Sequence, residues 1–351
     1  ALTGQDPVVV ALGERYVQAA LWMVPPSLGF VVLRSFVTGL SRPGVVTLVI
    51  TLALPVNLAL NYVLVFGAFG APALGVAGAG YASAIVAWLM FFGLVGYIQH
   101  DALLRGYRVF HRLLERDRAL SARIWRLGLP VAGLTLIEGS FFNFVIIIVG
   151  LFGAAALAAN QIVINTIAIA WTIGMSIGEA AAVRVSQEVG HQRATAAFRA
   201  GWLSIGFAIM AGLFFLLLLW QATDLIAGVF IDPSDPENAG VLELVSTLAT
   251  FGAVLAMVDC IHVVAARCLR GLEDTLVPML LSAVGYWVIA FPLGLVLAFV
   301  LDLGLTGLWI GFTAGLVVST TLTLYRWYYF SKRRRIPTPT NNDTGECQHH
   351  N

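Results

Sequence analysis

Three acidic side chains, Glu138, Glu179 and Asp259, lie inside long apolar stretches of the sequence. A charge in the hydrocarbon of a bilayer costs at least ~2.5–3.5 kcal/mol, so an acid at such a position usually has a function. Asp259 precedes Arg267 by eight positions, and Glu138 follows Arg126 by twelve. At about 1.5 Å per helical residue, both acids would lie about 12–18 Å from the membrane surface that these arginines mark.

Two carboxylates at one depth, on two different helices, predict a site for a cation or a proton. The alternative is that each acid only bonds a neighbouring hydroxyl or backbone group. We expect Glu138 and Asp259 to face one polar cavity, separated by no more than one bridging ion or water. Glu179 lies near Arg184 in the sequence, and we expect these two residues to form an ion pair.

Amide side chains form a second group of candidates. Asn57 and Asn61 are four residues apart, so they share one face of a helix. Their oxygens could ligate sodium or help to hold a proton, or the pair could serve helix packing. Asn160, Gln161 and Asn165 are also spaced to share a face, where they could bind a ligand or hold helices together.

The composition indicates an all-α, polytopic membrane protein. The 351 residues are 59% hydrophobic and 11% charged, with a mean hydropathy of +0.87. Only helices and closed barrels span a bilayer, and these apolar runs are too long for barrel strands. The sequence contains no Walker A, HExxH or GxSxG motif, and its three cysteines lack disulfide or zinc spacing. We therefore expect neither an enzyme nor a protein with a bound cofactor or metal, apart from a coupling ion.

Nine apolar segments are long enough to cross a bilayer. They cover roughly 16–39, 44–66, 75–98, 128–151, 155–183, 200–220, 241–266, 276–300 and 304–329. Basic residues follow the first, third, fifth, seventh and ninth segments, and the opposite loops are uncharged or acidic. By the positive-inside rule, the basic loops and the carboxyl terminus are cytoplasmic.

An internal repeat relates two parts of the chain. Gly39 followed by the GVAG sequence at 75–78 recurs as Gly271 followed by GLTG at 304–307. Three apolar segments precede the second copy within its half, whereas none precedes the first copy. We therefore expect two six-helix lobes in which the first three helices of the amino-terminal lobe are missing.

This plan divides the chain into four regions. Residues 1–98 form the second half of the amino-terminal lobe, 99–127 a cytoplasmic connector, 128–330 the carboxy-terminal lobe, and 331–351 a basic, then disordered tail. The connector has apolar residues at helical spacing, so we expect an amphipathic surface helix. They are Leu103, Tyr107, Phe110, Leu113 and Leu114. Its positive charge could instead bind nucleic acid, but basic inner loops are the ordinary product of membrane topology.

Several of these stretches resemble the multidrug and toxic compound extrusion (MATE) transporters, particularly the NorM-like branch. The matching sequences are LRSFVTGLSRP, LPVNLALNYVLVFGAFGAPALGVAGAGYAS, AANQIVINTIAIAWTIGMSIGEAAAVRVSQEVG, MVDCIHVVAARCLRGLED and YWVIAFPLG. The resemblance implies a two-lobe, inverted-V antiporter of twelve helices, of which this chain supplies nine. It implies the export of organic cations in exchange for Na⁺ or H⁺, by a monomer in the inner (plasma) membrane.

The resemblance also assigns residues to sites. Glu138 and Asp259 match the family's acids in helices seven and ten, which are linked to cation coupling. Asn57 and Asn61 match an amino-terminal cation site, and Gln161, Asn165 and Tyr286 are assigned to the substrate cavity. Glu179 stands where such sequences usually have a small residue. The alternative function is a flippase for lipid-linked or polyprenyl substrates with the same two-lobe plan, although flippases are expected to line the cavity with cations.

Overall fold

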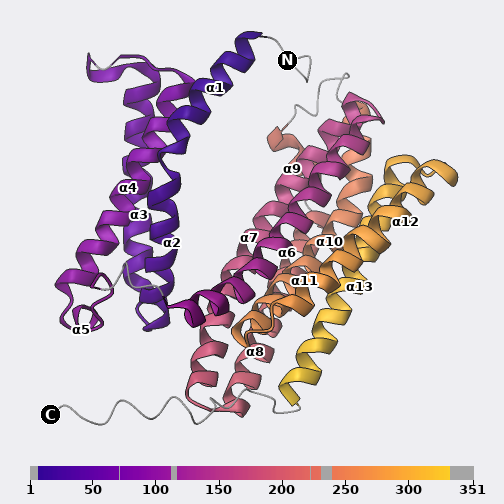
Figure 1. Cartoon of the computed structure of the whole chain (residues 1–351). Helices are drawn as coiled ribbons and strands as arrows, with labels where there is room; N and C mark the ends of the chain where they lie inside the picture. Colours follow the sequence, from indigo (N-terminus) through magenta and orange to yellow (C-terminus); the bar gives the residue numbers. More distant parts are fainter. Residues whose placement is uncertain (1–6, 71, 112–116, 222, 231–238, 333–351) are drawn as a thin grey trace. The chain divides into compact units, whose positions relative to one another are not determined.

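The computed structural model describes residues 7–70, 72–111, 117–221, 223–230 and 239–332. Every regular element in this part of the chain is helical (Figure 1). The chain divides into two compact units, Ala1–Arg116 and Asp117–Asn351. Eight of the described helices are long and apolar enough to cross a membrane, or nine spans if one bent pair counts as a single crossing. The predicted all-α, polytopic membrane fold is confirmed.

The first unit is built around one helix, α4 (Val76–His100), which packs most extensively against three others. These are α1 (Pro7–Leu21), α2 (Val24–Gly39) and α3 (Pro43–Phe66). A short helix, α5 (Ala102–Gly106), follows α4. The core of the unit lies where Phe30, Leu33 and Val37 of α2 meet Leu94 and Ile98 of α4.

The first predicted segment, 16–39, is a broken span. α1 and α2 are bent by 44° at a break of two residues, Trp22 and Met23. The physical cause follows directly in the sequence, because Pro25 and Pro26 cannot donate the backbone hydrogen bonds that would continue α1. Proline suits the first turn of a helix, where α2 begins.

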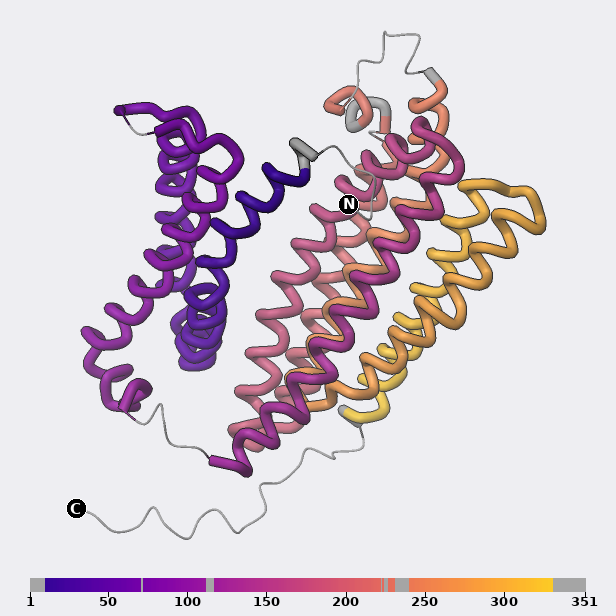
Figure 2. The backbone as a smooth tube through the Cα atoms, turned by 45° about the horizontal axis from the view of Figure 1, so that its top comes forward, coloured from indigo at the N-terminus to yellow at the C-terminus, as the bar shows by residue number. Residues whose placement is uncertain are grey.

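The second unit packs around α7 (Ala154–Gly190) and α10 (Ala239–Gly271), which pack closely against each other. Figure 2 traces the backbone of this unit from magenta to yellow. Both helices contact α8 (Ala194–Gln221), and α10 also contacts α13 (Gly304–Lys332). α6 (Arg118–Gly150) packs on α7 and on α11 (Leu276–Ala283), and α9 (Thr223–Phe230) is short. Glycines allow α7 and α10 to approach closely: a Cβ at Gly174 would lie 3.2 Å from the Cα of Cys260.

The predicted segment 276–300 is one irregular crossing. It consists of α11, the π-helix η3 (Val284–Ala290), α12 (Phe291–Leu295) and the π-helix η4 (Val296–Val300). Pro292 lies in α12, between the two π-helical stretches. Proline lacks an N–H group and its ring crowds the preceding turn, which favours a wider helix around it. Tyr286 lies in the first of these π-helices.

The two sequence repeats have the same local structure. Ser41 and Glu273, each two residues past a helix-ending glycine, both have a φ of 63°. Gly75, which precedes α4, and Gly304, the first residue of α13, have φ values of 56° and 55°. Glycine adopts this left-handed conformation without steric cost, which explains its place at both turns.

The repeats also share a polar contact at one end, with the charges reversed. Arg42 donates to the Asp101 carboxylate and to the Tyr97 hydroxyl at 3.0 Å. At the equivalent turn of the second unit, Asp274 accepts from the Nε of Arg326 at 2.8 Å. Within each unit, therefore, the turn that follows the first repeated helix (α2 or α10) contacts the last part of the third repeated helix (α4 or α13) or the residue that follows it.

The predicted connector helix was wrong in its extent. α4 continues to His100, α5 has only five residues, and α6 already begins at Arg118. Of the apolar residues expected on one face, Leu103 and Tyr107 are exposed and Phe110 is half-buried, whereas the neighbouring Leu104 is buried. Residues 112–116, which include Leu113 and Leu114, lie outside the described residues. The tail 333–351 also lies outside them, so its predicted disorder stays a prediction.

Candidate functional site

Glu138 and Asp259 belong to two helices of the second unit, α6 and α10. Asp259 is buried, with 8% of its surface exposed, and Glu138 is half-buried. The two acids are close enough to interact electrostatically. Among the described residues, neither acid forms a hydrogen bond or an ion pair. The alternative that each acid bonds a nearby hydroxyl or backbone group thus finds no support there.

A cavity of about 150 Å³ lies beside Glu138. α6, α7, α10, α11 and the turn before α11 line it, and Asp259 is not among the lining residues. Its polar and aromatic lining comprises Thr135, Glu138, Trp171, His262, Arg267, Arg270, Asp274 and Thr275. Of the two acids expected to face one cavity, Glu138 lines this cavity and Asp259 does not. Helix α10 contributes His262, one turn beyond Asp259.

Sequence reasoning missed His262 as a residue of this site. Its ring is 1% exposed, and its Nε2 lies 3.2 Å from the Ser282 hydroxyl. Its Nδ1 has no hydrogen-bond partner in the part of the chain that the structure describes. The signal was present, because His262 follows Asp259 by three positions and so shares its face of α10.

Tyr286 lies deeper than the substrate assignment implies. It is 2% exposed and does not line the cavity. Its ring packs against Phe141 with centroids 5.0 Å apart, and against His262 at 6.5 Å. Tyr286 is nevertheless within electrostatic range of both Glu138 and Asp259. It therefore belongs to the packed interior near the two acids rather than to the lining of the cavity.

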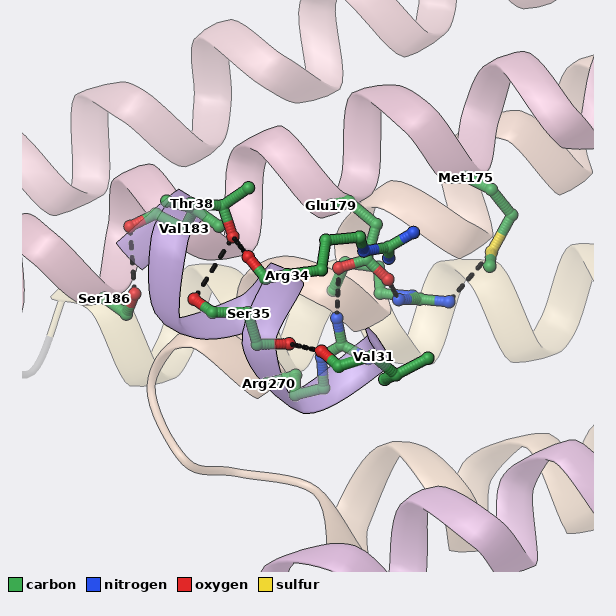
Figure 3. A network of polar contacts seen from close by, with 10 residues as sticks. Val31, Arg34, Ser35, Thr38, Met175, Glu179, Val183, Ser186 and Arg270 are labelled. Atoms are coloured by element: carbon green, nitrogen blue, oxygen red, sulfur yellow. Dashed lines mark hydrogen bonds and ion pairs between the residues drawn. The ribbon is translucent and has the colours of Figure 1, made fainter. Parts of the chain in front are cut away.

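The expected ion pair between Glu179 and Arg184 was wrong. Glu179 pairs instead with Arg267 and, at 2.7 Å, with Arg270 of α10 (Figure 3). Arg184 pairs with Glu188 at 3.1 Å on its own helix. The reason is helical geometry, since residues four apart lie on one face and residues five apart do not.

The predicted shared face of α7 holds for Gln161 and Asn165 but is wrong for Asn160. In α7, Gln161 donates to Asn165 at 3.1 Å, and both side chains are exposed. Asn160 points elsewhere: it is 1% exposed, and its amide nitrogen and oxygen find no partner among the described residues. In the first unit, Asn61 donates to the side-chain oxygen of Asn57 at 3.0 Å. Their proposed roles in cation and substrate binding stay predictions.

A permanent metal centre has no support in the described residues. No group of three or more His, Cys, Asp or Glu side chains there is arranged to hold a metal ion. Glu138, Asp259 and the orphaned nitrogen of His262 instead form a small set of groups that can accept a proton or a monovalent cation.

Comparisons with known proteins agree with this architecture. A probable multidrug resistance protein NorM of Mesorhizobium japonicum is 37% identical over 338 residues, which cover 96% of this chain and 71% of that protein. One from Rhodopseudomonas palustris is also 37% identical, over 94% of this chain and 69% of its own length.

Solved structures share the fold at lower identity. The eukaryotic MATE transporter AtDTX14 aligns with a TM-score of 0.80 and 21% identity over 95% of this chain and 73% of its own. A MOP superfamily transporter from Pyrococcus furiosus aligns with a TM-score of 0.83 and 15% identity over 94% of this chain and 72% of its own.

The family model MatE matches residues 1–63 and 130–296, which together make up more than half of the chain. These ranges include Asn57, Asn61, Glu138 and Asp259, so the candidate residues lie within the matched sequence. The matched family consists of membrane transporters rather than enzymes, in keeping with the helical, membrane-spanning fold. The chain therefore belongs to the MatE family, the multidrug and toxic compound extrusion transporters.

Proposed function

We propose that this protein is a secondary active antiporter that exports organic cations in exchange for Na⁺ or H⁺. The observation that carries the proposal is the pair of acids on α6 and α10, Glu138 and Asp259, which interact with each other and form no ion pair with a basic side chain among the described residues. The NorM relatives, which carry the name of multidrug resistance proteins, support an organic cation as the exported substrate.

The pair suits antiport because its charge needs compensation inside the membrane. An uncompensated carboxylate in hydrocarbon is costly, so the site favours occupancy by a proton, a sodium ion or a cationic substrate. If these cations compete for the same carboxylates, an inward ion gradient displaces the outgoing substrate. Asn57 and Asn61 would supply a second, amide-based cation site in the first unit.

The substrate path would be lined by groups that bind cations and apolar rings. Trp171 and Met175 line the cavity beside Glu138, and both offer polarisable surface to an organic cation. Gln161 and Asn165 present exposed amides on the same helix, α7. Tyr286 would act indirectly, from the packed interior near the two acids.

The charge pattern supports an orientation in which the carboxyl terminus lies in the cytoplasm. We propose that the protein acts as a monomer in the inner membrane. Within the second unit, Arg123 of α6 pairs with Glu273 at 2.5 Å. Arg326 of α13 pairs with Asp274, the next residue. These contacts support a common side for the beginning of α6, the turn after α10 and the end of α13.

The decisive experiment measures dye efflux from cells that express the full-length protein, under imposed Na⁺ or H⁺ gradients. Asp259→Asn and Glu138→Gln keep side-chain shape but remove the charge that binding uses, so each should abolish gradient-driven efflux. Glu188→Gln is the matched control, because it removes another acid of the second unit that does not line the cavity. Efflux by Asp259→Asn at the wild-type rate would refute the coupling role.

The alternative, a flippase for lipid-linked or polyprenyl substrates, is tested in the same cells. Arg267 and Arg270 line the cavity and could meet a phosphate, but both pair with Glu179. A flippase would move a labelled lipid-linked phosphate and leave organic cations in place. That outcome would replace the antiporter proposal.

A further inference from the structure

Arg267 is a cation built into the wall of the proposed cation site. It lines the same cavity as Glu138, and it lies on α10 eight residues beyond Asp259. It also interacts electrostatically with Glu138. A guanidinium that moved closer to Glu138 would neutralise this carboxylate as effectively as a substrate would.

The structure holds Arg267 in a different place. Its Nη1 pairs with Glu179, and its Nη2 lies 2.9 Å from the sulfur of Met175. Its aliphatic stem crosses α7 at Gly178, where an added Cβ would lie 2.8 Å from the Cγ of Arg267. Met175, Gly178 and Glu179 lie along one face of α7, so this helix fixes the position of the arginine. Figure 3 shows Met175 and Glu179 on this helix.

We propose that Glu179 is a positioning residue that keeps Arg267 away from Glu138 and thereby sets the cation affinity of the Glu138–Asp259 pair. This inference rests on the proposed function. Glu179 touches neither acid of the pair; it acts through Arg267. Since Glu179 also pairs with Arg270, one carboxylate compensates two arginines of α10. Removing this carboxylate leaves both guanidinium groups in a cavity whose lining acids are Glu138 and Asp274, and Asp274 already pairs with Arg326.

A purely structural role would have the same contacts but different consequences. As a clamp, the ion pairs would only hold α7 against α10, and losing either partner would be equally harmful. As a positioning device, losing Glu179 is harmful only while Arg267 is present. The two possibilities therefore separate in a double mutant that lacks both charges.

The experiment measures efflux of ethidium at several concentrations, together with binding of tetraphenylphosphonium to the purified full-length protein. Glu179→Gln should raise the KM for ethidium and the Kd for tetraphenylphosphonium about tenfold, with little change in maximal rate, because a freed guanidinium competes with the substrate. Glu179→Gln with Arg267→Gln should return both constants to within about twofold of wild type. Arg267→Gln alone should bind at least as tightly as wild type.

The matched control is Glu179→Gln with Arg270→Gln. It removes the same number of charges, but it leaves Arg267, the arginine that acts on Glu138, in place. This variant should therefore keep the weakened binding. Unchanged constants in Glu179→Gln, or failure of Arg267→Gln to restore them, would overturn the inference. A wild-type protein that neither binds nor exports these cations would instead overturn the proposed function.

Discussion

Asp259 and Glu138 differ in how the surrounding helices present them. Asp259 is buried in α10 among packed helices, whereas Glu138 reaches the cavity from α6. Both could be recognised from the sequence, because an acid within an apolar transmembrane segment is energetically costly whichever way the helix faces. The partner of Glu179 could not be recognised in the same way. Arg267 and Arg270 are about ninety residues away, and only the packing of α7 on α10 brings them together.

At the residue scale, we predict that the two acids act as one unit. Glu138→Gln with Asp259→Asn should be little worse in ion-driven efflux than either single variant, because each single change already breaks the site. A double-mutant cycle on the initial rate of dye efflux measures this coupling. Effects that simply multiply would show that the acids act in separate steps.

The shape of individual helices cannot be read from the hydrophobic pattern alone. The break between α1 and α2 and the π-helices around Pro292 both occur at prolines. The sequence marks these positions as irregular, but not whether a helix kinks, breaks or widens there. That outcome depends on how neighbouring helices satisfy the freed backbone groups.

The helix pair α8 and α13 provides a test of close packing. A Cβ at Gly201 would clash with the ring of Trp327, which is fully buried. Gly201→Ala should therefore destabilise the protein by about 1–3 kcal/mol, as overpacking usually does. Gly206→Ala on the same helix meets nothing within 4 Å and should be neutral or slightly stabilising. Thermal unfolding in detergent compares the two; equal midpoints would contradict the packing argument.

The cap of α5 should respond to acid. The backbone N–H of Leu104 lowers the pKa of Asp101 below its usual value, and the Arg42 guanidinium and the N–H of Leu103 contribute further. Because the folded-state pKa is depressed, the stabilisation is complete above the unfolded pKa of about 4 and is lost as pH falls through the folded value. Helix α5 should therefore stay ordered near neutral pH and loosen in acid.

Hydrogen exchange of the peptide covering 102–107, corrected for intrinsic rates, measures this loosening. Asp101→Asn keeps a capping oxygen but cannot titrate, so its protection should not depend on pH in this range. If the wild-type peptide also shows no pH dependence, Asp101 does not control the order of α5.

At the scale of the whole molecule, the hydrophobic pattern predicted the number and order of crossings well. Each predicted segment corresponds to a described helix, to a bent helix pair or, at 276–300, to a run of four helical elements, because approximately twenty apolar residues are needed to cross a bilayer. The connector was less predictable, since α4 and α6 extend beyond their apolar parts into polar sequence.

The native cysteines allow a test of the proposed orientation. Cys260 and Cys268 are fully buried in the second unit, and Cys347 is the third cysteine of the chain. A membrane-impermeant maleimide should label Cys347 in inside-out vesicles but not in intact cells. Cys347→Ser should abolish the signal under native conditions. Labelling of Cys347 from outside intact cells would reverse the proposed topology.

The reversed charges at the two repeated turns bear on how a duplicated membrane protein assembles. In one copy the turn carries Arg42 and the helix end Asp101; in the other, the turn carries Asp274 and the helix end Arg326. If a turn approached the helix end of the wrong copy during insertion, two arginines or two aspartates would meet and repel each other. The reversed charges thus favour pairing within each repeat over pairing between the two repeats, so each turn associates with the helix of its own copy.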